Sequence, residues 1–583
     1  MAHYIGIDVG TGSARACVIS EAGDIVGLAS HDIQKWNDKH GYYEQSTTDI
    51  WAAIGKAVQQ AIREIDPTSV CGIGFDATCS LAVFTQQGEP ISVTPPNFKV
   101  DADARNVILW LDHRPEAETA LINRTNHPLL KYVGGTMSIE MEIPKALWLK
   151  NNLPSETFAN ARFYDLADAL TFLATGDNSR SFCSAVCKQG YVPVGVDGSV
   201  KGWQADFLTS IGLTELCEND FVRMGGVNGV NGRFLTAGEP VGKLSETAAA
   251  QLGLPAGIAV GSGVIDAYAG WIGTVGAKVD IDPKWRDESH EAGDVSQAFT
   301  RLAAVAGTST CHLAMSPDPV FVPGVWGPYR DVLIPGYWMA EGGQSATGEL
   351  LQHIIMQHPA AKELLMEAER AGQKVVYEYL NGKLKKMAAD AGAPDCSVSW
   401  LGRHFFFYGD FFGNRSPVAD SNMRGSVTGL SNDISVDNLA LQYYGTMEFI
   451  ALQTRQIVST MNDAGHRIRS IFMSGGQCRN DILMALISTA CDMPVFIPRY
   501  VDAAVVHGAA MLGAKAASHA GGQGESLWDI MARMSKPGST VYPSSNLTER
   551  KLLDVKYKVF LEQCEQQQRW RREVDEALAG TKP

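Results

Sequence analysis

An aspartate and a glycine-rich turn near the N-terminus are the residues best placed to do chemistry. Tyr4 to Asp8 is a short apolar β-type run, Gly10-Thr11-Gly12 is a tight turn, and Ala14 to Ile19 alternates again like a strand. Such a hairpin can aim backbone N–H groups at a polyphosphate, because glycine permits both the turn and the close approach. We therefore predict phosphate-binding residues at Gly10, Thr11, Gly12, Ser13 and Arg15.

Asp8 ends the first of these strands, where its carboxylate could hold Mg²⁺ beside the phosphates. One aspartate is enough, since magnesium usually takes one or two protein carboxylates and completes its shell with phosphate oxygens and water. The alternative is a carboxylate that only caps the turn.

A second hairpin of the same kind lies in the other half of the chain. Leu302 to Ala306 runs into Gly307-Thr308-Ser309-Thr310 and then into Cys311 to Ala314. Gly307, Thr308 and Ser309 are predicted to face the same phosphates from the opposite side. One such hairpin early in each half indicates an internally duplicated architecture, although turns of this composition also arise by chance. The spacing G-x-G-x-x-R lacks the third glycine of a dinucleotide fingerprint, and no Gly-Lys pair is followed by Ser or Thr as a P-loop requires.

The elements between the hairpins indicate an α/β protein. Val70 to Phe84 is interpreted as one buried strand that carries Asp76, and Asp49 to Ile65 and Phe163 to Thr175 have helical apolar spacing. Strands and helices that alternate in this way are typical of layered α/β folds. The polar segment from Thr548 to Ala579 is predicted to be a surface helix packed on one side.

Length and composition narrow the class of protein. A chain of 583 residues exceeds what one hydrophobic core usually supports, and we predict two domains, 1–272 and 273–583. The net charge of −15 argues against a nucleic-acid partner. We find no apolar run long enough to span a membrane, so we expect no membrane partner. We expect no secretory signal, and the eleven scattered cysteines are typical of reduced thiols, so we expect a cytoplasmic location.

Several motifs together resemble a known family. In order along the chain they are GIDVGTGSAR, HGYYEQSTTDIW, the Asp76 strand, PKALWLK, AGTSTCHL, GNRSPVADSNMRGSVTGL, SGGQCRND and VVHGAAMLGA. The chain resembles the FGGY carbohydrate kinases of the sugar-kinase, actin and heat-shock-chaperone ATPase superfamily over nearly its whole length. The resemblance implies two ribonuclease-H-like domains with an interdomain cleft, and ATP and Mg²⁺ as cofactors.

The same resemblance assigns roles to particular residues. Gly475, Gly476 and Asn480 would border the adenosine. Asp266, in GSGVIDAYAGWIG, would be the catalytic base and would also contact the substrate. An aspartate at a helix start is favoured in its ionised form by the helix dipole, and we expect it to stay a competent proton acceptor. The alternative for Asp266 is a simple helix N-cap.

For the sugar, the closest local resemblance is to the ribulokinase and D-ribulose kinase group. Lys188 and Glu341 match positions that contact the ketopentose, Cys79 falls where a small residue lines the pocket, and Asp112 could add a contact or belong to a surface or interdomain charge cluster. The resemblance implies phosphorylation of a terminal hydroxyl of D-ribulose, with L-ribulose and D-xylulose as alternatives. A sugar-sensing or chaperone-like ATPase without phosphotransfer is the rival from another class. Family members are often dimers, which leaves a homodimer open.

Overall fold

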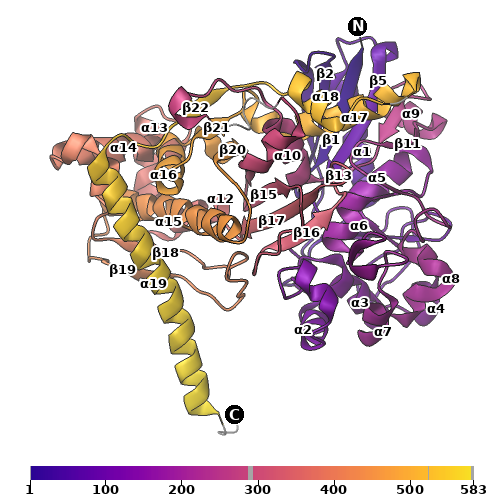
Figure 1. The fold of residues 1–583 in the computed structure, drawn as a ribbon, viewed down its shortest axis with the longest axis horizontal. Helices are drawn as coiled ribbons and strands as arrows, with labels where there is room; N and C mark the ends of the chain where they lie inside the picture. The colour runs from indigo at the N-terminus through magenta and orange to yellow at the C-terminus, as the bar shows by residue number, and fades with distance from the viewer. Residues whose placement is uncertain (1, 287–292, 523, 580–583) are drawn as a thin grey trace.

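Two α/β bodies lie side by side, one built mainly from the first half of the chain and the other from the second (Figure 1). The computed structural model describes residues 2–286, 293–522 and 524–579. None of the helices in these described ranges is long and apolar enough to cross a membrane.

The first body is organised around a sheet with strand order β3-β2-β1-β5-β12-β11, and β13 pairs with β5 off this path. Its strands are β1 (His3–Val9), β2 (Ser13–Ser20), β3 (Ile25–Asp32), β5 (Val70–Ala77), β11 (Pro240–Lys243), β12 (Ala259–Gly261) and β13 (Val264–Ile265). The strands β1, β2 and β3 are antiparallel, β1, β5 and β12 are parallel, and β11 closes the edge antiparallel to β12. The predicted N-terminal hairpin is β1 and β2.

The second body repeats this topology. Its strand order is β16-β17-β15-β14-β20-β21-β22. The strands are β14 (Arg301–Ala306), β15 (Thr310–Ser316), β16 (Trp326–Arg330), β17 (Trp338–Gln344), β20 (Ser470–Ser474), β21 (Val495–Ile497) and β22 (Ser539–Val541). From β17 to β22, successive neighbours pair antiparallel, antiparallel, parallel, parallel and antiparallel, which is the same order of directions as from β3 to β11. The predicted internal duplication is confirmed, with β14 and β15 as the second hairpin.

Two helices cross between the bodies. The helix α10 (Asp266–Val275) follows the first sheet but packs on β14 of the second, whereas α17 (Ala504–Ser518) follows the second sheet but packs on β1 and β5 of the first. The two helices also pack on each other so closely that a Cβ on Gly273 or Gly508 would lie 2.0 Å from a carbonyl oxygen of the other helix. Since α17 is part of the second chain half, the division at residues 272 and 273 stays a prediction.

One predicted strand is wrong. The run from Val70 to Phe84 breaks into β5 and β6 (Leu81–Thr85), which belong to different sheets. The chain leaves the first sheet at Thr78, whose N–H still donates to the Val9 carbonyl, and whose hydroxyl then contacts that of Ser80 at 3.2 Å. The strand β6 joins a small sheet of β4 (Glu44–Gln45), β7 (Val107–Ile108) and β8 (Ala161–Asp165).

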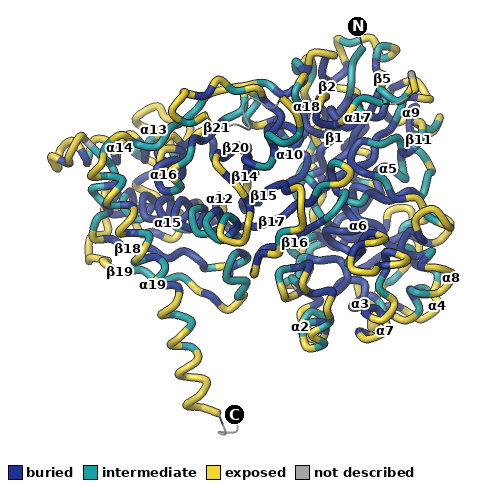
Figure 2. The backbone as a smooth tube through the Cα atoms, in the orientation of Figure 1, coloured by how far each residue is buried: buried dark blue, intermediate teal, exposed yellow. Residues whose placement is uncertain are grey.

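Helices cover the sheets and bury their faces, as the continuous buried segments in Figure 2 show. The longer helices of the first body are α1 (Thr47–Ala61), α2 (Glu116–Arg124), α3 (Glu142–Asn152), α5 (Leu166–Thr175), α6 (Phe182–Lys188) and α9 (Glu246–Leu252). Those from the second half are α12 (Gly348–Gln357), α13 (Ala361–Arg370), α14 (Val376–Asp390), α15 (Val436–Asp463), α16 (Asp481–Cys491), α18 (Leu527–Met534) and α19 (Leu547–Leu578). The predicted C-terminal surface helix is α19, which packs on one side near its start and projects beyond the body at its end (Figures 1 and 2).

Candidate functional site

Three carboxyl groups meet at the end of the first sheet. Asp8 on β1 stands in register with Asp76 on β5, β13 pairs with β5 at the same level, and Asp266 follows β13 as the first residue of α10. The parallel pairing of β1 and β5 is what brings Asp8 and Asp76 together. Neither oxygen of the buried Asp76 accepts a bond from a donor among the described residues, so no hydrogen-bond donor there balances the charge of its carboxylate.

Burial controls the charge of this group. It raises the pKa of Asp8, partly opposed by Arg15 at 3.9 Å, and raises the pKa of Asp76 further because Asp8 and Asp266 add negative charge beside it. Burial, followed by the charge of Asp8, raises the pKa of Asp266 to about 7. Desolvation thus outweighs the hydrogen bond from the Ala267 N–H at 2.7 Å and the helix start, which both favour the ionised form, and the role of Asp266 as a proton acceptor stays a prediction.

The first predicted phosphate turn is held by hydrogen bonds and is open on one side. The Gly10 N–H donates to the Ser13 carbonyl at 3.0 Å, and the Thr11 carbonyl and hydroxyl accept bonds from Gln45 and Trp110. No described atom lies within 4 Å of where a Cβ on Gly12 would stand. The turn therefore presents bare backbone to an open space beside Asp8.

The second predicted turn has the same open character. The Gly307 N–H donates to the Ser309 carbonyl at 2.9 Å, the Thr308 carbonyl accepts from backbone N–H groups at the start of α12, and Gln477 donates to the Gly307 carbonyl at 2.8 Å. No described atom would contact a Cβ on Gly307 or Gly476 within 4 Å. Gly475, with φ of 92°, lies so close to β14 that a Cβ would stand 2.2 Å from the Ala306 carbonyl oxygen. The approach of β20 to β14 thus requires glycine at position 475, whereas Gly307 and Gly476 leave open space beside the backbone.

Asn480, predicted at the adenosine, has its side chain engaged in the protein. It caps α16 by accepting from the Leu483 N–H, accepts from Asn381 at 2.9 Å, and donates to the Tyr443 hydroxyl at 2.7 Å. These bonds fix the start of α16 behind the Gly475-Gly476 turn. A direct contact of Asn480 with a nucleotide stays a prediction.

Lys188 and Glu341 form a buried ion pair between the two halves of the chain. The Lys188 ammonium, at the end of α6, donates to both oxygens of Glu341 on β17 at 3.0 and 3.1 Å. Burial is the largest single influence on the pKa of Lys188 and lowers it, but Glu341 together with Cys79, Tyr329 and Cys187 outweighs burial, and the net pKa is well above the usual value. The pair belongs to the same electrostatic environment as Asp266, because Lys188 lowers and Glu341 raises the pKa of that residue.

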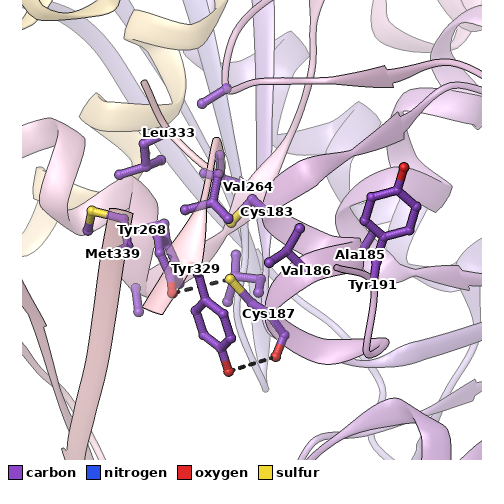
Figure 3. Packing of buried hydrophobic residues seen from close by; sticks show 14 of the residues in the cluster. Cys183, Ala185, Val186, Cys187, Tyr191, Val264, Tyr268, Tyr329, Leu333 and Met339 are labelled. Carbon is purple, nitrogen blue, oxygen red and sulfur yellow. Dashed lines mark hydrogen bonds between the residues drawn. The ribbon is translucent and has the colours of Figure 1, made fainter. Parts of the chain in front are cut away.

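A chain of hydroxyl and thiol contacts supports this pair. The Tyr268 hydroxyl, on α10, donates to Glu341 at 3.2 Å and accepts from the Cys187 thiol at 3.2 Å, and the Tyr329 hydroxyl donates to the Cys187 carbonyl at 3.3 Å. Figure 3 shows these rings converging on Cys187 from α10 and β16. Cys79, predicted to line the sugar pocket, lies close enough to Lys188 and Asp266 for both to affect the pKa of its thiol, which burial raises.

Asp112 is a buried structural carboxylate rather than part of a surface cluster. One oxygen accepts from the Tyr43 N–H at 2.6 Å, and both accept from the Arg114 guanidinium, which also pairs with Glu44 at 2.9 Å. Its side chain is fully covered. A contact of Asp112 with the sugar stays a prediction.

The sequence did not single out Asp76 or Gln477 as site residues. Asp76 was recognised only as a buried aspartate, and its position beside Asp8 depends on the pairing of strands far apart in the chain. Gln477 lies within SGGQCRND, and the sequence feature that points to it is a polar side chain directly after two glycines.

The comparisons with known proteins identify the class. The model of the FGGY carbohydrate kinase N-terminal domain matches residues 3–273, and that of the C-terminal domain matches residues 302–517. The chain belongs to the FGGY family of carbohydrate kinases, and it is an ATP-dependent sugar kinase with the α/β actin-like ATPase fold. The predicted family, fold class and enzyme class are confirmed.

Individual relatives sharpen this placement. The chain is 53% identical over 517 residues to a D-ribulokinase of Saccharomyces cerevisiae, a match that covers 88% of this chain and 72% of the relative. It is 40% identical to a human FGGY carbohydrate kinase domain-containing protein over 97% of both chains. Among solved structures, a xylulose kinase from Rhodospirillum rubrum has a TM-score of 0.71 at 19% identity, covering 97% of this chain and 99% of that one. A Plasmodium falciparum glycerol kinase with ADP has a TM-score of 0.68 at 16% identity, covering 97% and 98%.

Proposed function

We propose that this protein is a D-ribulokinase, which transfers the γ-phosphate of ATP to a terminal hydroxyl of D-ribulose. The observation that carries the proposal is the position of Asp266. Its Oδ1 accepts from the Ala267 N–H and leaves the second oxygen for a substrate proton, while a pKa of about 7 makes it an effective base near neutral pH. The 53% identity to a D-ribulokinase supports the choice of sugar.

In this mechanism the two glycine turns hold the phosphates and the Lys188–Glu341 pair holds the sugar. Phosphoryl transfer needs an acceptor hydroxyl aimed at the γ-phosphorus, and positioning supplies much of the rate. Lys188 can donate to a hydroxyl or the carbonyl of a ketose, and Glu341 can accept from hydroxyls. Asp266 takes the proton of the hydroxyl as the new O–P bond forms, while the bond from the γ-phosphorus to the bridging oxygen breaks and ADP leaves. Closure of the two bodies excludes water, which would otherwise accept the phosphate.

The acidic group at the end of β1 and β5 fits a magnesium ion. Asp76 is a buried carboxyl whose oxygens accept from no N–H or O–H donor among the described residues, and Asp8 faces it. Among the described residues, no cluster of three or more His, Cys, Asp or Glu side chains could hold a metal alone. Asp8 and Asp76 would therefore hold Mg²⁺ together with phosphate oxygens and water, and the ion would shield charge on the transferring phosphoryl group.

A screen of acceptors tests this proposal. Purified protein with ATP and Mg²⁺ is assayed for ADP release in the presence of D-ribulose, L-ribulose, D-xylulose, pentitols, hexuloses and glycerol. We expect D-ribulose to give the highest kcat/KM. A higher value for another acceptor would refute D-ribulose as the substrate, and ADP release independent of every sugar would favour the ATPase without phosphotransfer. A cytoplasmic location and a homodimer complete the proposal; fractionation and light scattering test them.

A further inference from the structure

A second buried ion pair joins the two halves beside the sugar site. Arg415, from the motif GNRSPVADSNMRGSVTGL, donates through Nη2 to Oε1 of Glu140 at 2.8 Å. The two side chains are 6% and 19% exposed. They lie 275 residues apart in sequence, one in each half of the chain, so the bond links the two halves.

Arg415 also packs against residues that lie beside Glu341 in the second sheet. Its Cζ lies 5.6 Å from the centre of the Trp326 ring, and the Lys188 ammonium lies 4.4 Å from the centre of the same ring. Its stem passes over β17, where a Cβ on Gly343 would stand 2.8 Å from Cδ of Arg415. The guanidinium therefore packs against the residues that flank the Lys188–Glu341 pair, and the absent side chain of Gly343 makes room for it.

Glu140 belongs to a segment that is tied to the site on its other side. The Glu140 carbonyl accepts from the buried Lys145 ammonium at 3.1 Å, and Lys145 acts on the pKa of the Cys79 thiol, as Glu140 does. A few residues upstream, Val133 forms a backbone bridge with Gly327 next to Trp326. The Arg415–Glu140 bond thus joins the Glu140 segment of the first half to the residues of the second half that surround Trp326.

We propose that Arg415 is a positioning residue for phosphotransfer, which acts through Glu140 to hold the two halves in the closed geometry around the sugar. The inference rests on the proposed function for the identity of the site. An ion pair that is largely shielded from water is strong only when its partners meet at close range. The pair therefore adds its energy to the arrangement of the two bodies in which Lys188 and Glu341 lie beside Asp266.

A double-mutant cycle tests the proposal. The variants are Arg415→Met, Glu140→Gln and the two combined, with Arg415→Lys as the conservative change. Arg455→Met is the matched control, because Arg455 pairs with Asp554 at 2.7 Å within the second body. For each variant we would measure kcat, the KM of the sugar, the Kd of ATP without sugar, and the melting temperature with and without sugar.

We expect each single change to lower kcat/KM for the sugar by roughly 10- to 100-fold, and the combined variant to lose no more than the worse single change. Arg415→Lys should recover part of the loss. The Kd of ATP should stay close to that of the wild type, whereas the rise in melting temperature on adding sugar should shrink. A merely structural pair would lower the melting temperature equally with and without sugar and would leave kcat/KM for the sugar unchanged.

Losses that multiply in the combined variant, or unchanged sugar kinetics in both single variants, would overturn the proposal. If Arg415→Met does not fold, Glu140→Gln decides alone, because it keeps the size of the side chain and removes only its charge. The cycle uses D-ribulose, or the acceptor that the screen identifies. Inactivity with D-ribulose but coupled losses with another sugar would refute the proposed substrate and support the role of Arg415.

Discussion

Replacing Asp266 with asparagine removes the proposed base while keeping its shape. The amide oxygen of the new side chain would still accept the bond that the Ala267 N–H makes to Oδ1 at 2.7 Å, so the start of α10 should stay intact. The second oxygen becomes an NH₂ group, which donates and cannot take a proton. General-base catalysis contributes about 10²- to 10⁴-fold, so we expect kcat to fall by that factor, or about 3 to 5 kcal/mol of barrier.

The folded protein should not be destabilised by the Asp266→Asn change, although its activity falls. Burial raises the pKa of Asp266, so the ionised carboxylate opposes folding, and an uncharged amide relieves that cost. The assay combines sugar-dependent ADP release, calorimetric sugar binding and thermal unfolding. We expect the sugar affinity to stay within about three-fold, because the contacts of Lys188 and Glu341 remain, and the melting temperature not to fall. Near-normal turnover in a folded variant would refute the role of Asp266.

Three further changes have defined outcomes. Because Asp266 must be ionised to act and its pKa is about 7, kcat/KM for the sugar should fall tenfold per pH unit below about 7, and a pH profile of initial rates checks this. Gly74→Ala should lower the free energy of unfolding by about 1 to 3 kcal/mol in urea titrations, because the new Cβ would lie 2.1 Å from a backbone oxygen of α17. Lys556→Met should cost about 3 to 5 kcal/mol of unfolding free energy, because it leaves Glu448, 2.8 Å away, buried without its partner.

Matched controls separate these causes from general damage. In the Asp266→Asn variant, the residual activity should no longer fall as the pH drops below about 7. Gly382→Ala, in α14 with open space among the described atoms around its Cβ position, should stabilise by about 0.5 to 1 kcal/mol. Combining Lys556→Met with Glu448→Gln should recover most of the loss. The pH prediction would be refuted if the Asp266→Asn variant kept the same fall in activity at low pH. The packing prediction would be refuted if Gly74→Ala and Gly382→Ala lost equal stability. The ion-pair prediction would be refuted if the losses from Lys556→Met and Glu448→Gln were additive.

Local features of the site could be predicted from the sequence, whereas contacts between distant segments could not. The hairpins at Gly10 and Gly307 were predictable because an apolar period of two and a glycine turn are encoded within a few residues. The break after β5 was missed because Val70 to Phe84 is apolar throughout most of its length, and nothing in that run shows that its two ends enter different sheets. Both outcomes follow from how far along the chain the determining contacts reach.

The chemistry of the carboxyl groups shows the same limit. Asp266 was found through the family resemblance, but its raised pKa depends on burial and on Asp8, which comes from the far end of the first half. Asp76 became a site residue only through its register with Asp8, and the Arg415–Glu140 pair joins segments 275 residues apart. Residue types and spacing cannot supply such neighbours.

The most direct test of the central claim is the identity of the product. Wild-type protein is incubated with ATP, Mg²⁺ and ¹³C-labelled D-ribulose, and the mixture is followed by ¹³C and ³¹P NMR. We predict ADP and a ribulose phosphate in equal amounts, with phosphorus–carbon coupling at a terminal carbon. ADP accompanied by inorganic phosphate and unchanged sugar, or phosphate on an internal hydroxyl, would contradict it.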